Sequence, residues 1–235
     1  MLEIVSFTLG PAQTNAYLVA DSETRDAAVI DPAWDGELIL KAARQRGWRI
    51  AHLWYTHAHF DHIGGAGAIA DALNPLPLVA LHPNDQVLWR AGGGGALFGF
   101  DIDPGPEPTI DFYQGQILRL GSVEFEVRFT PGHTPGHCIL YVANPRVSTT
   151  GQTITTPPLT RVPMHSGSAG VCFCGDVIFA GSVGRTDLPS GSWEQLEHSI
   201  LTQIFTLPDE TRLLSGHGPE TTVGEEKRTN PFVSG

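Results

Sequence analysis

Positive charge is scarce in this sequence. Only 14 of its 235 residues are Lys or Arg, against 25 Asp and Glu, which gives a formal net charge of −11 at pH 7. Charged residues of both signs amount to 17%, below the usual quarter of a globular protein. DNA, RNA and anionic membranes are bound by basic surfaces, so we expect neither nucleic acid nor a membrane to be the main partner.

Long apolar runs and paired cysteines are also missing. Gly, Pro or a charged residue interrupts every apolar stretch well before the ~18 residues that a membrane-spanning helix needs. Residues 1–7, MLEIVSF, lack the basic start and continuous apolar segment of a signal peptide. The three cysteines, Cys138, Cys172 and Cys174, are an odd number and too few for a disulfide framework, which favours reduced thiols. Together these absences predict a cytoplasmic protein.

Gly and Pro, by contrast, are abundant. The 27 Gly and 18 Pro make 45 of 235 residues, about 19% against an average near 12%. Together with 41% hydrophobic residues, this composition predicts one loop-rich domain over residues 1–235 with a sizeable core. Two long loops are expected, one at 91–108 and an inserted surface loop at 144–170.

The hydrophobic pattern alternates between strand-like and helix-like segments, which predicts an α/β fold. Residues 192–195 form a capping box for a helix that continues to about 207, and Gly47 lies where a helix C-cap is expected. Expected helices cover 35–46, 63–73, 84–90 and 192–207, and expected strands cover 4–9, 15–20, 27–30, 50–55, 76–81, 116–120, 123–130, 137–142, 171–175 and 211–215.

The segment 56–62, THAHFDH, contains four side chains of the types that bind metal ions. His57, His59, Asp61 and His62 follow a predicted buried strand within six residues. One such His is more often a surface residue, but four together at this spacing are hard to explain structurally. Imidazole and carboxylate suit Zn²⁺, Fe²⁺ or Mn²⁺, and the absence of a thiol from the segment argues against a structural zinc finger.

Three later loops add single side chains of the same types. His133 lies in TPGHTPGH, Asp176 in GD and His217 in SGHG, each after a predicted strand. Each signal alone is weak, because a strand-end Asp is usually a turn former. Sites in α/β proteins gather at the carboxyl ends of strands, so we expect these loops to converge on one edge.

The motifs HxHxDH, PGHTPGH, GD and GHG, in this order, resemble those of the metallo-β-lactamase-fold hydrolases. The flanking segments 7–11, 15–19, 184–187 and 224–232 resemble the glyoxalase II-like branch, the hydroxyacylglutathione hydrolases. The resemblance implies an αββα four-layer sandwich, with two mixed sheets packed face to face and helices outside. In glyoxalase II a C-terminal helical domain grips glutathione. This sequence ends at Gly235, so we expect that domain to be absent.

The resemblance also implies a site with two divalent metal ions, most plausibly zinc, with iron or manganese as alternatives. A hydroxide bridging the two ions would attack the substrate carbonyl, and Asp61 would also orient this nucleophile. The implied ligands of the first ion are His57, His59 and His133; those of the second are Asp61, His62 and His217; and Asp176 bridges both.

The function implied is that of a metal-dependent thioesterase acting on acylated glutathione or a similar small thioester. The alternative is a mononuclear iron persulfide dioxygenase acting on glutathione persulfide, in which His57, His133 and Asp176 would bind Fe²⁺. The complete second ligand set favours the hydrolase. A β-lactamase would be expected to carry an export signal, which argues against that activity.

Several other residues have two interpretations. Arg185 either forms a local ion pair with Asp187 or binds a substrate carboxylate. His137 is expected to have a structural role, and Cys172 and Cys174 to pack in the core. Phe98, Phe100, Phe112 and Tyr113 line either a substrate entrance or an ordinary core. The physiological substrate and the oligomeric state are not predicted.

Overall fold

The computed structural model describes residues 1–143, 145, 147–148, 154–155 and 170–233. Its two main sheets are both mixed, with parallel and antiparallel neighbours. The first sheet has the strand order β10 (Val147–Ser148), β1 (Leu2–Leu9), β2 (Thr14–Asp21), β3 (Asp26–Ile30), β4 (Arg49–Trp54), β5 (Leu78–Leu81) and β6 (Ile110–Asp111), and β11 (Ile154–Thr155) also pairs with β1.

The second sheet has the order β16 (Thr221–Thr222), β15 (Arg212–Ser215), β12 (Val171–Gly175), β9 (Cys138–Val142), β8 (Val123–Phe129) and β7 (Ile117–Leu120). A separate hairpin joins β13 (Ile178–Phe179) to β14 (Ser182–Val183). The helices are α1 (Gly36–Arg46), α2 (Phe60–Ile63), α3 (Ala66–Asp71), α4 (Gln86–Arg90), α5 (Trp193–Ser199) and α6 (Val223–Thr229), with 3₁₀ turns at Pro83–Asp85 and Gly92–Phe98 and a π-helical turn at Ile200–Ile204.

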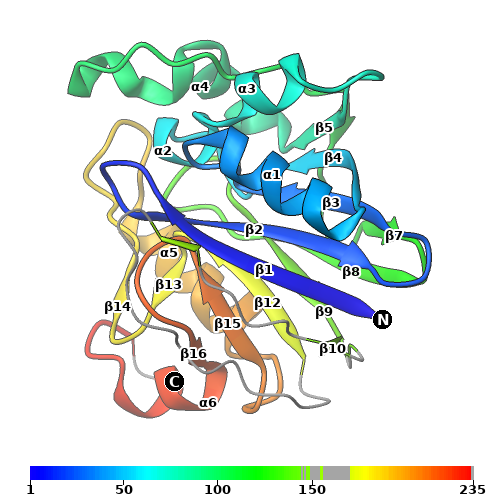
Figure 1. Ribbon diagram of the computed structural model, residues 1–235. Coiled ribbons are helices and arrows are strands. Elements are labelled where there is room, and N and C mark those ends of the chain that lie inside the picture. Colours follow the sequence, from blue (N-terminus) through cyan, green and yellow to red (C-terminus); the bar gives the residue numbers. More distant parts are fainter. Residues whose placement is uncertain (144, 146, 149–153, 156–169, 234–235) are drawn as a thin grey trace.

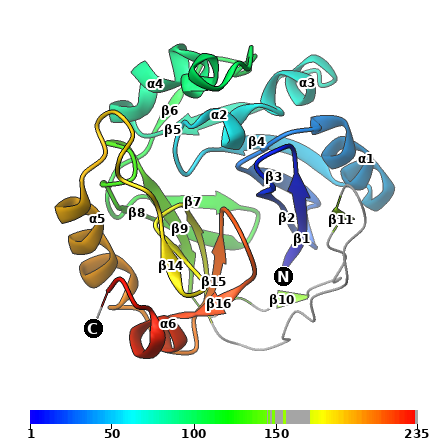
Figure 2. The same ribbon diagram turned by 90° about the vertical axis from the view of Figure 1, so that its left-hand side faces the viewer.

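Three buried hydrophobic clusters define four layers. Side chains alternate between the two faces of a strand, so adjacent residues enter different clusters. In β1, Val5 packs toward α1 and α3, whereas Ile4 packs between the two sheets. In β12, Phe173 lies between the sheets, whereas Cys172 packs toward α5. Figures 1 and 2 show α1 to α4 on one side of the sheets and α5 and α6 on the other. The predicted αββα sandwich is therefore confirmed.

The local signals for α1 gave the right helix. It spans Gly36–Arg46, and Gly47 is its left-handed C-cap at φ 67°. The helix predicted over 63–73 starts earlier, at Phe60, and is divided into α2 and α3 by Gly64 and Gly65. The Gly65 N–H donates to the carbonyl oxygen of Ala33 (2.7 Å) instead of to a carbonyl within the helix. A Cβ at Gly65 would lie 2.6 Å from the carbonyl oxygen of Pro32, so this close contact with the preceding loop requires glycine.

Both predicted long loops contain regular structure. A 3₁₀ turn occupies Gly92–Phe98 within the loop expected at 91–108. Within the expected insertion at 144–170, β10 and β11 pair with β1 because an edge strand offers unpaired backbone groups; the remainder, apart from Pro145 and Gly170, lies outside the described residues. The helix α6 was not expected from the sequence. None of the helices in the described part of the chain is both long and apolar enough to cross a lipid bilayer.

Candidate metal centre

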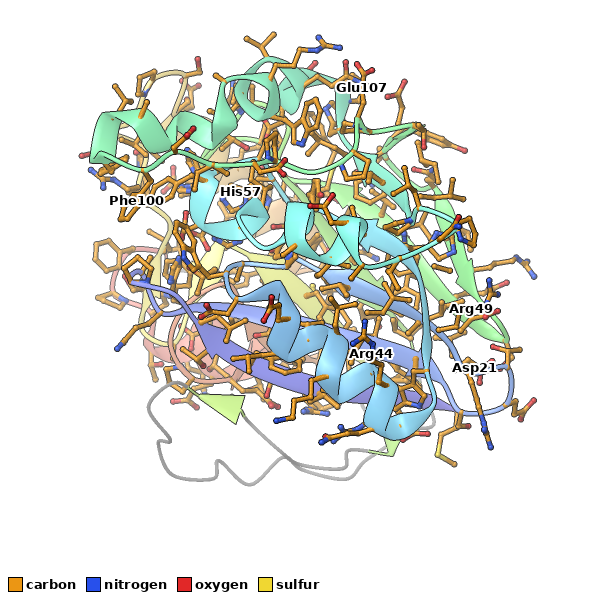
Figure 3. All side chains as sticks on the ribbon, turned by 45° about the horizontal axis from the view of Figure 1, so that its top comes forward. Asp21, Arg44, Arg49, His57, Phe100 and Glu107 are labelled. Carbon is orange, nitrogen blue, oxygen red and sulfur yellow. The ribbon has the colours of Figure 1, made fainter. Side chains whose placement is uncertain are left out.

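Four loops bring the metal-binding side chain types together at one end of the two sheets. The segment 56–62 follows β4 and enters α2, while His133 follows β8, Asp176 follows β12 and His217 follows β15. In Figure 3, His57 lies at one end of the strands, and Asp21 and Arg49 lie at the other. The convergence expected from the strand ends is therefore present, although the loops come from two different sheets.

The side chains form two groups, each compact enough for one ion. The ligand atoms of His57, His59 and His133 all lie within 4.8 Å of one another. The same limit holds for Asp61, His62 and His217. These two groups are the two sets of three side chains that the resemblance implied for the first and the second ion.

Asp176 lies between the two groups. Its Oδ1 atom is 3.3 Å from His62 Nε2, and its Oδ2 atom is 3.6 Å from His133 Nε2 and 3.4 Å from His217 Nε2. One carboxylate therefore faces imidazoles of both groups.

Hydrogen bonds behind the site fix which nitrogen of each imidazole faces inward. The Thr56 hydroxyl donates to Asp31 Oδ2 (2.7 Å), so its oxygen accepts from Nδ1 of His57 (3.0 Å). Nδ1 of His62 donates to the same Asp31 oxygen (3.0 Å), and Nδ1 of His133 donates to the carbonyl oxygen of Arg185 (2.7 Å). In His57 and His62 the Nε2 lone pair is left for the centre of the site, the arrangement that a metal requires. The Nε2 of His133 faces Nδ1 of His59 across the first group at 2.8 Å.

His137 has the opposite arrangement. Its Nε2 accepts the backbone N–H of Asp176 (3.1 Å), which leaves Nδ1 to donate to the Thr130 hydroxyl (2.9 Å). Both ring nitrogens are used, and the ring stacks on His57 with centroids 4.9 Å apart. The structural role expected for His137 agrees with this geometry.

The charge in the site needs a cation. Burial opposes the charged form of His62, but Asp176 and Asp61 outweigh it and raise its pKa well above the ordinary value. In the same way, the two carboxylates overcome burial and raise the pKa of His217 to about 9. The carboxylates thus hold protons on both rings wherever no cation replaces them.

Buried polar atoms without partners mark where such a cation would lie. Within the described residues, His57 Nε2, His62 Nε2 and Asp176 Oδ1 are buried and lack a hydrogen bond. Leaving such atoms unsatisfied is costly, and all three point into the two groups. The residues therefore fit divalent metal ions.

Residues distant in sequence hold the ligand loops in place. The buried Asp85 carboxylate accepts from the Ala58 N–H (3.1 Å), the Thr134 hydroxyl (2.7 Å) and the Gly136 N–H (2.6 Å), which joins the first histidine loop to the loop of His133. Neither Asp85 nor Asp31 was expected from the sequence. The available signals were an Asp directly before Pro32 at a strand end and an Asp in the turn after a strand.

The loop of His217 is held by the start of β2. Asn15 donates its N–H to the Gly216 carbonyl (2.7 Å) and its side-chain amide to the Ser215 carbonyl (3.0 Å). The Thr14 hydroxyl donates to Asp61 Oδ2 (2.8 Å). A Cβ at Gly216 would overlap Asp176 Oδ1, so the loop can come this close to the carboxylate only with glycine.

A cavity of about 310 Å³ opens directly beside the two groups of candidate ligands. Arg185 belongs to its lining, and its guanidinium also donates two hydrogen bonds to Asp187, of 2.6 and 2.8 Å. The lining consists of Ala12, His59, Phe60, Asp61, Phe98, His133, Asp176, Arg185, Leu188 and His217.

The structure places the remaining aromatic and cysteine residues of the sequence analysis either at the cavity, in the core or on the surface. Phe98 lines the cavity, whereas Phe112 is a core residue between the sheets and Tyr113 is exposed. Cys172 and Cys174 are buried in the cluster between the second sheet and α5, as expected for core packing.

The sequence matches a known protein family and is similar to proteins from bacteria. Residues 9–164 and 152–217 match the family described as "Metallo-beta-lactamase superfamily". The chain is 35% identical to a probable metallo-hydrolase, YqgX, of Bacillus subtilis, over 97% of this chain and 95% of that protein. It is 31% identical to the hydroxyacylglutathione hydrolase GloC of Haemophilus influenzae, over 99% of this chain and 98% of GloC.

Solved structures show the same fold. The BLEG-1 B3 metallo-β-lactamase matches with a TM-score of 0.81 and 32% identity, over 100% of both chains. A di-iron-bound form of TTHA1623 matches with a TM-score of 0.75 and 35% identity, over 96% of this chain and 98% of that chain. ETHE1 from Myxococcus xanthus matches with a TM-score of 0.73 and 25% identity, over 97% of this chain and 83% of that chain.

Proposed function

The chain belongs to the metallo-β-lactamase superfamily, whose fold binds divalent metals, and from this premise we propose that it is a thioesterase cleaving acylated glutathione or a similar small thioester. The observation that carries this proposal is the pair of ligand groups that face one shared carboxylate, Asp176. The 31% identity to GloC along almost the whole chain supports the choice of substrate.

The proposed metal ligands are those named from the sequence. His57, His59 and His133 would hold one ion, and Asp61, His62 and His217 the other, with Asp176 shared. Zinc is the proposed metal because the donors are imidazole and carboxylate, and iron is supported by the di-iron form of TTHA1623. Two such ions, when bound, supply a water of lowered pKa as nucleophile and polarise the carbonyl oxygen of the substrate.

The chain's own residues supply orientation. Asp61 presents Oδ2 toward His217 Nε2 (3.3 Å) while it accepts from Thr14, so its carboxylate has a fixed direction from which to orient the nucleophile. Apart from the proposed ligands, no lining residue in the described part of the chain is an acid. A thioester suits this cavity, because a thiolate leaving group needs little protonation.

The alternative is a mononuclear iron persulfide dioxygenase that uses His57, His133 and Asp176. The di-iron form of TTHA1623 supports iron as the bound metal. The second group of Asp61, His62 and His217 is equally compact, which favours the dinuclear hydrolase.

One substrate panel separates these functions. We expect purified protein to hydrolyse S-lactoylglutathione, with a high KM, and to hydrolyse other small thioesters. The same preparation is tested on glutathione persulfide with an oxygen electrode, and on a cephalosporin because of the likeness to BLEG-1. Oxygen uptake without thioester cleavage would replace the hydrolase by the dioxygenase, and cephalosporin turnover alone would replace it by a lactamase.

Arg185 is the proposed contact for a substrate carboxylate. The Arg185→Ala variant is expected to raise KM for S-lactoylglutathione about five- to tenfold and to change kcat less, because a remote contact stabilises ground state and transition state alike. The matched control is Arg228→Ala, whose guanidinium also pairs with a carboxylate, Glu225, but lies outside the cavity. An equal rise in KM for thioesters without carboxylates would remove this role from Arg185 and leave the metal chemistry intact.

We also propose that the protein acts in the cytoplasm. The support is that Cys138, Cys172 and Cys174 are all free and buried, as is usual for proteins of reducing compartments.

A further inference from the structure

Four of the described residues that line the cavity beside the metal centre are apolar, namely Ala12, Phe60, Phe98 and Leu188, and we call these four side chains the apolar wall. The other described lining residues are proposed ligands and Arg185. Phe98 is 48% exposed, although a side chain of this kind usually gains about 1.5–3 kcal/mol from full burial. An apolar ring left open beside a reaction centre is a surface for a ligand to cover.

Aromatic packing holds Phe98 in position. Its ring stacks on Phe60 with centroids 5.2 Å apart, and Phe60 stacks in turn on Phe100 at 5.4 Å. Trp34 packs edge-on against both Phe60 (6.1 Å) and Phe100 (5.4 Å). Figure 3 shows Phe100 at the same end of the strands as His57. Since Phe60 directly precedes Asp61, this aromatic cluster fixes Phe98 relative to the ligand loop.

The turn that carries Phe98 is built for this contact. Gly93 has φ 65°, and a Cβ there would overlap the backbone nitrogen of Phe60. At Gly95, a Cβ would lie 2.8 Å from Ile102 Cγ1. At Gly93 only glycine lets the turn approach α2 this closely, so the position of Phe98 beside Phe60 is fixed.

Little positive charge is available for a strongly anionic substrate. Arg185 is the one cationic side chain among the described lining residues, and Asp187 already accepts two of its hydrogen bonds. Three further cations, Arg90, Lys227 and Arg228, form ion pairs and lie outside the cavity lining. Arg146 and Arg161 lie outside the described residues. Among the described lining residues, apolar contact therefore offers more to a substrate than charge does.

We infer that Phe98, with Phe60, Leu188 and Ala12, forms a subsite for the acyl chain of the substrate, and that the substrate class is thioesters of apolar acids of medium length. This inference rests on the proposed thioesterase function. It assigns the thiol part of the substrate to Arg185, the cationic group among the described lining residues. A cavity of about 310 Å³ is at the lower end of the range for small-molecule sites, which suits a short or medium chain better than a long one.

The test compares S-acetyl-, S-butyryl- and S-hexanoylglutathione in the wild type and three variants. A fully buried methylene improves binding by about fourfold, and in an open cavity we expect kcat/KM to rise about tenfold from acetyl to hexanoyl. Phe98→Ala should lose most of this rise, whereas Phe98→Leu should keep part of it. Leu97→Ala is the matched control, because Leu97 is 73% exposed on the same turn but does not line the cavity.

A binding experiment separates the subsite from the chemistry. S-methyl- and S-hexylglutathione carry no thioester, and calorimetry should show about tenfold tighter binding of the hexyl compound to the wild type but not to Phe98→Ala. Equal binding of both compounds, or thioester hydrolysis without chain-length preference, would overturn the subsite and leave the thioesterase standing. Preference for the hexyl compound without hydrolysis of any thioester would overturn the thioesterase and retain the subsite. Preservation of the hexanoyl preference in Phe98→Ala would also overturn the role of Phe98.

Discussion

The Asp61→Ala variant is expected to lose thioester turnover by on the order of 100-fold or more while it keeps its fold. The Asp61 carboxylate lies 3.3 Å from His217 Nε2 and 3.6 Å from His62 Nε2, so its loss removes one proposed ligand and the proposed orienting group for the nucleophile. The three hydrophobic clusters do not include Asp61, which is why the core should survive the substitution.

The measurements are kcat and KM on the best thioester, circular dichroism and metal content. We expect the content to fall toward one ion per chain with an unchanged spectrum. Asp209→Ala is a suitable control, since Asp209 is an exposed carboxylate paired with Lys227 and distant from the cavity lining. Near-normal turnover in Asp61→Ala would contradict the assigned role, whatever the metal content.

Removal of metal is expected to abolish activity and to lower thermal stability. Three buried or nearly buried carboxylates, Asp31, Asp61 and Asp176, meet in the site, and protons on His62 and His217 compensate for them poorly compared with divalent ions. Ions present at about 100 times their dissociation constant stabilise the fold by ~2.7 kcal/mol per site. For a chain of this size, two sites correspond to a rise in Tm of about 10–20 °C.

This prediction is checked by metal analysis of protein purified without chelators, followed by chelation and readdition. We expect two equivalents per chain, loss of turnover and a lower Tm after chelation, and recovery of both with zinc. A reproducible single equivalent of iron under metal-replete conditions would favour the dioxygenase. An unchanged Tm after complete removal would contradict the predicted stabilisation, because ions bound preferentially to the folded chain must raise Tm.

The sequence pattern alone was enough to predict a helix where apolar spacing and capping residues within that segment determine it. The apolar spacing of 35–46 and Gly47 predicted α1, and the Ser192 side chain accepts from the Gln195 N–H at the start of α5 as its capping box indicates. The same reasoning failed at 63–73, because the break at Gly64 and Gly65 depends on contact with the distant loop after β3.

The ligand types and their order along the chain were determined by the sequence alone, because each motif is a short segment at a strand end and its chemistry depends on residue identity. Tertiary structure decided everything that joins these segments. Asp31 orients His62 from 31 residues away, and the carbonyl of Arg185 orients His133 from 52 residues away. The apolar wall around Phe98 likewise depends on its contact with Phe60. No spacing rule anticipates such pairs, since hydrogen bonds and ring contacts between distant residues exist only once two sheets have packed and their loops meet at one end.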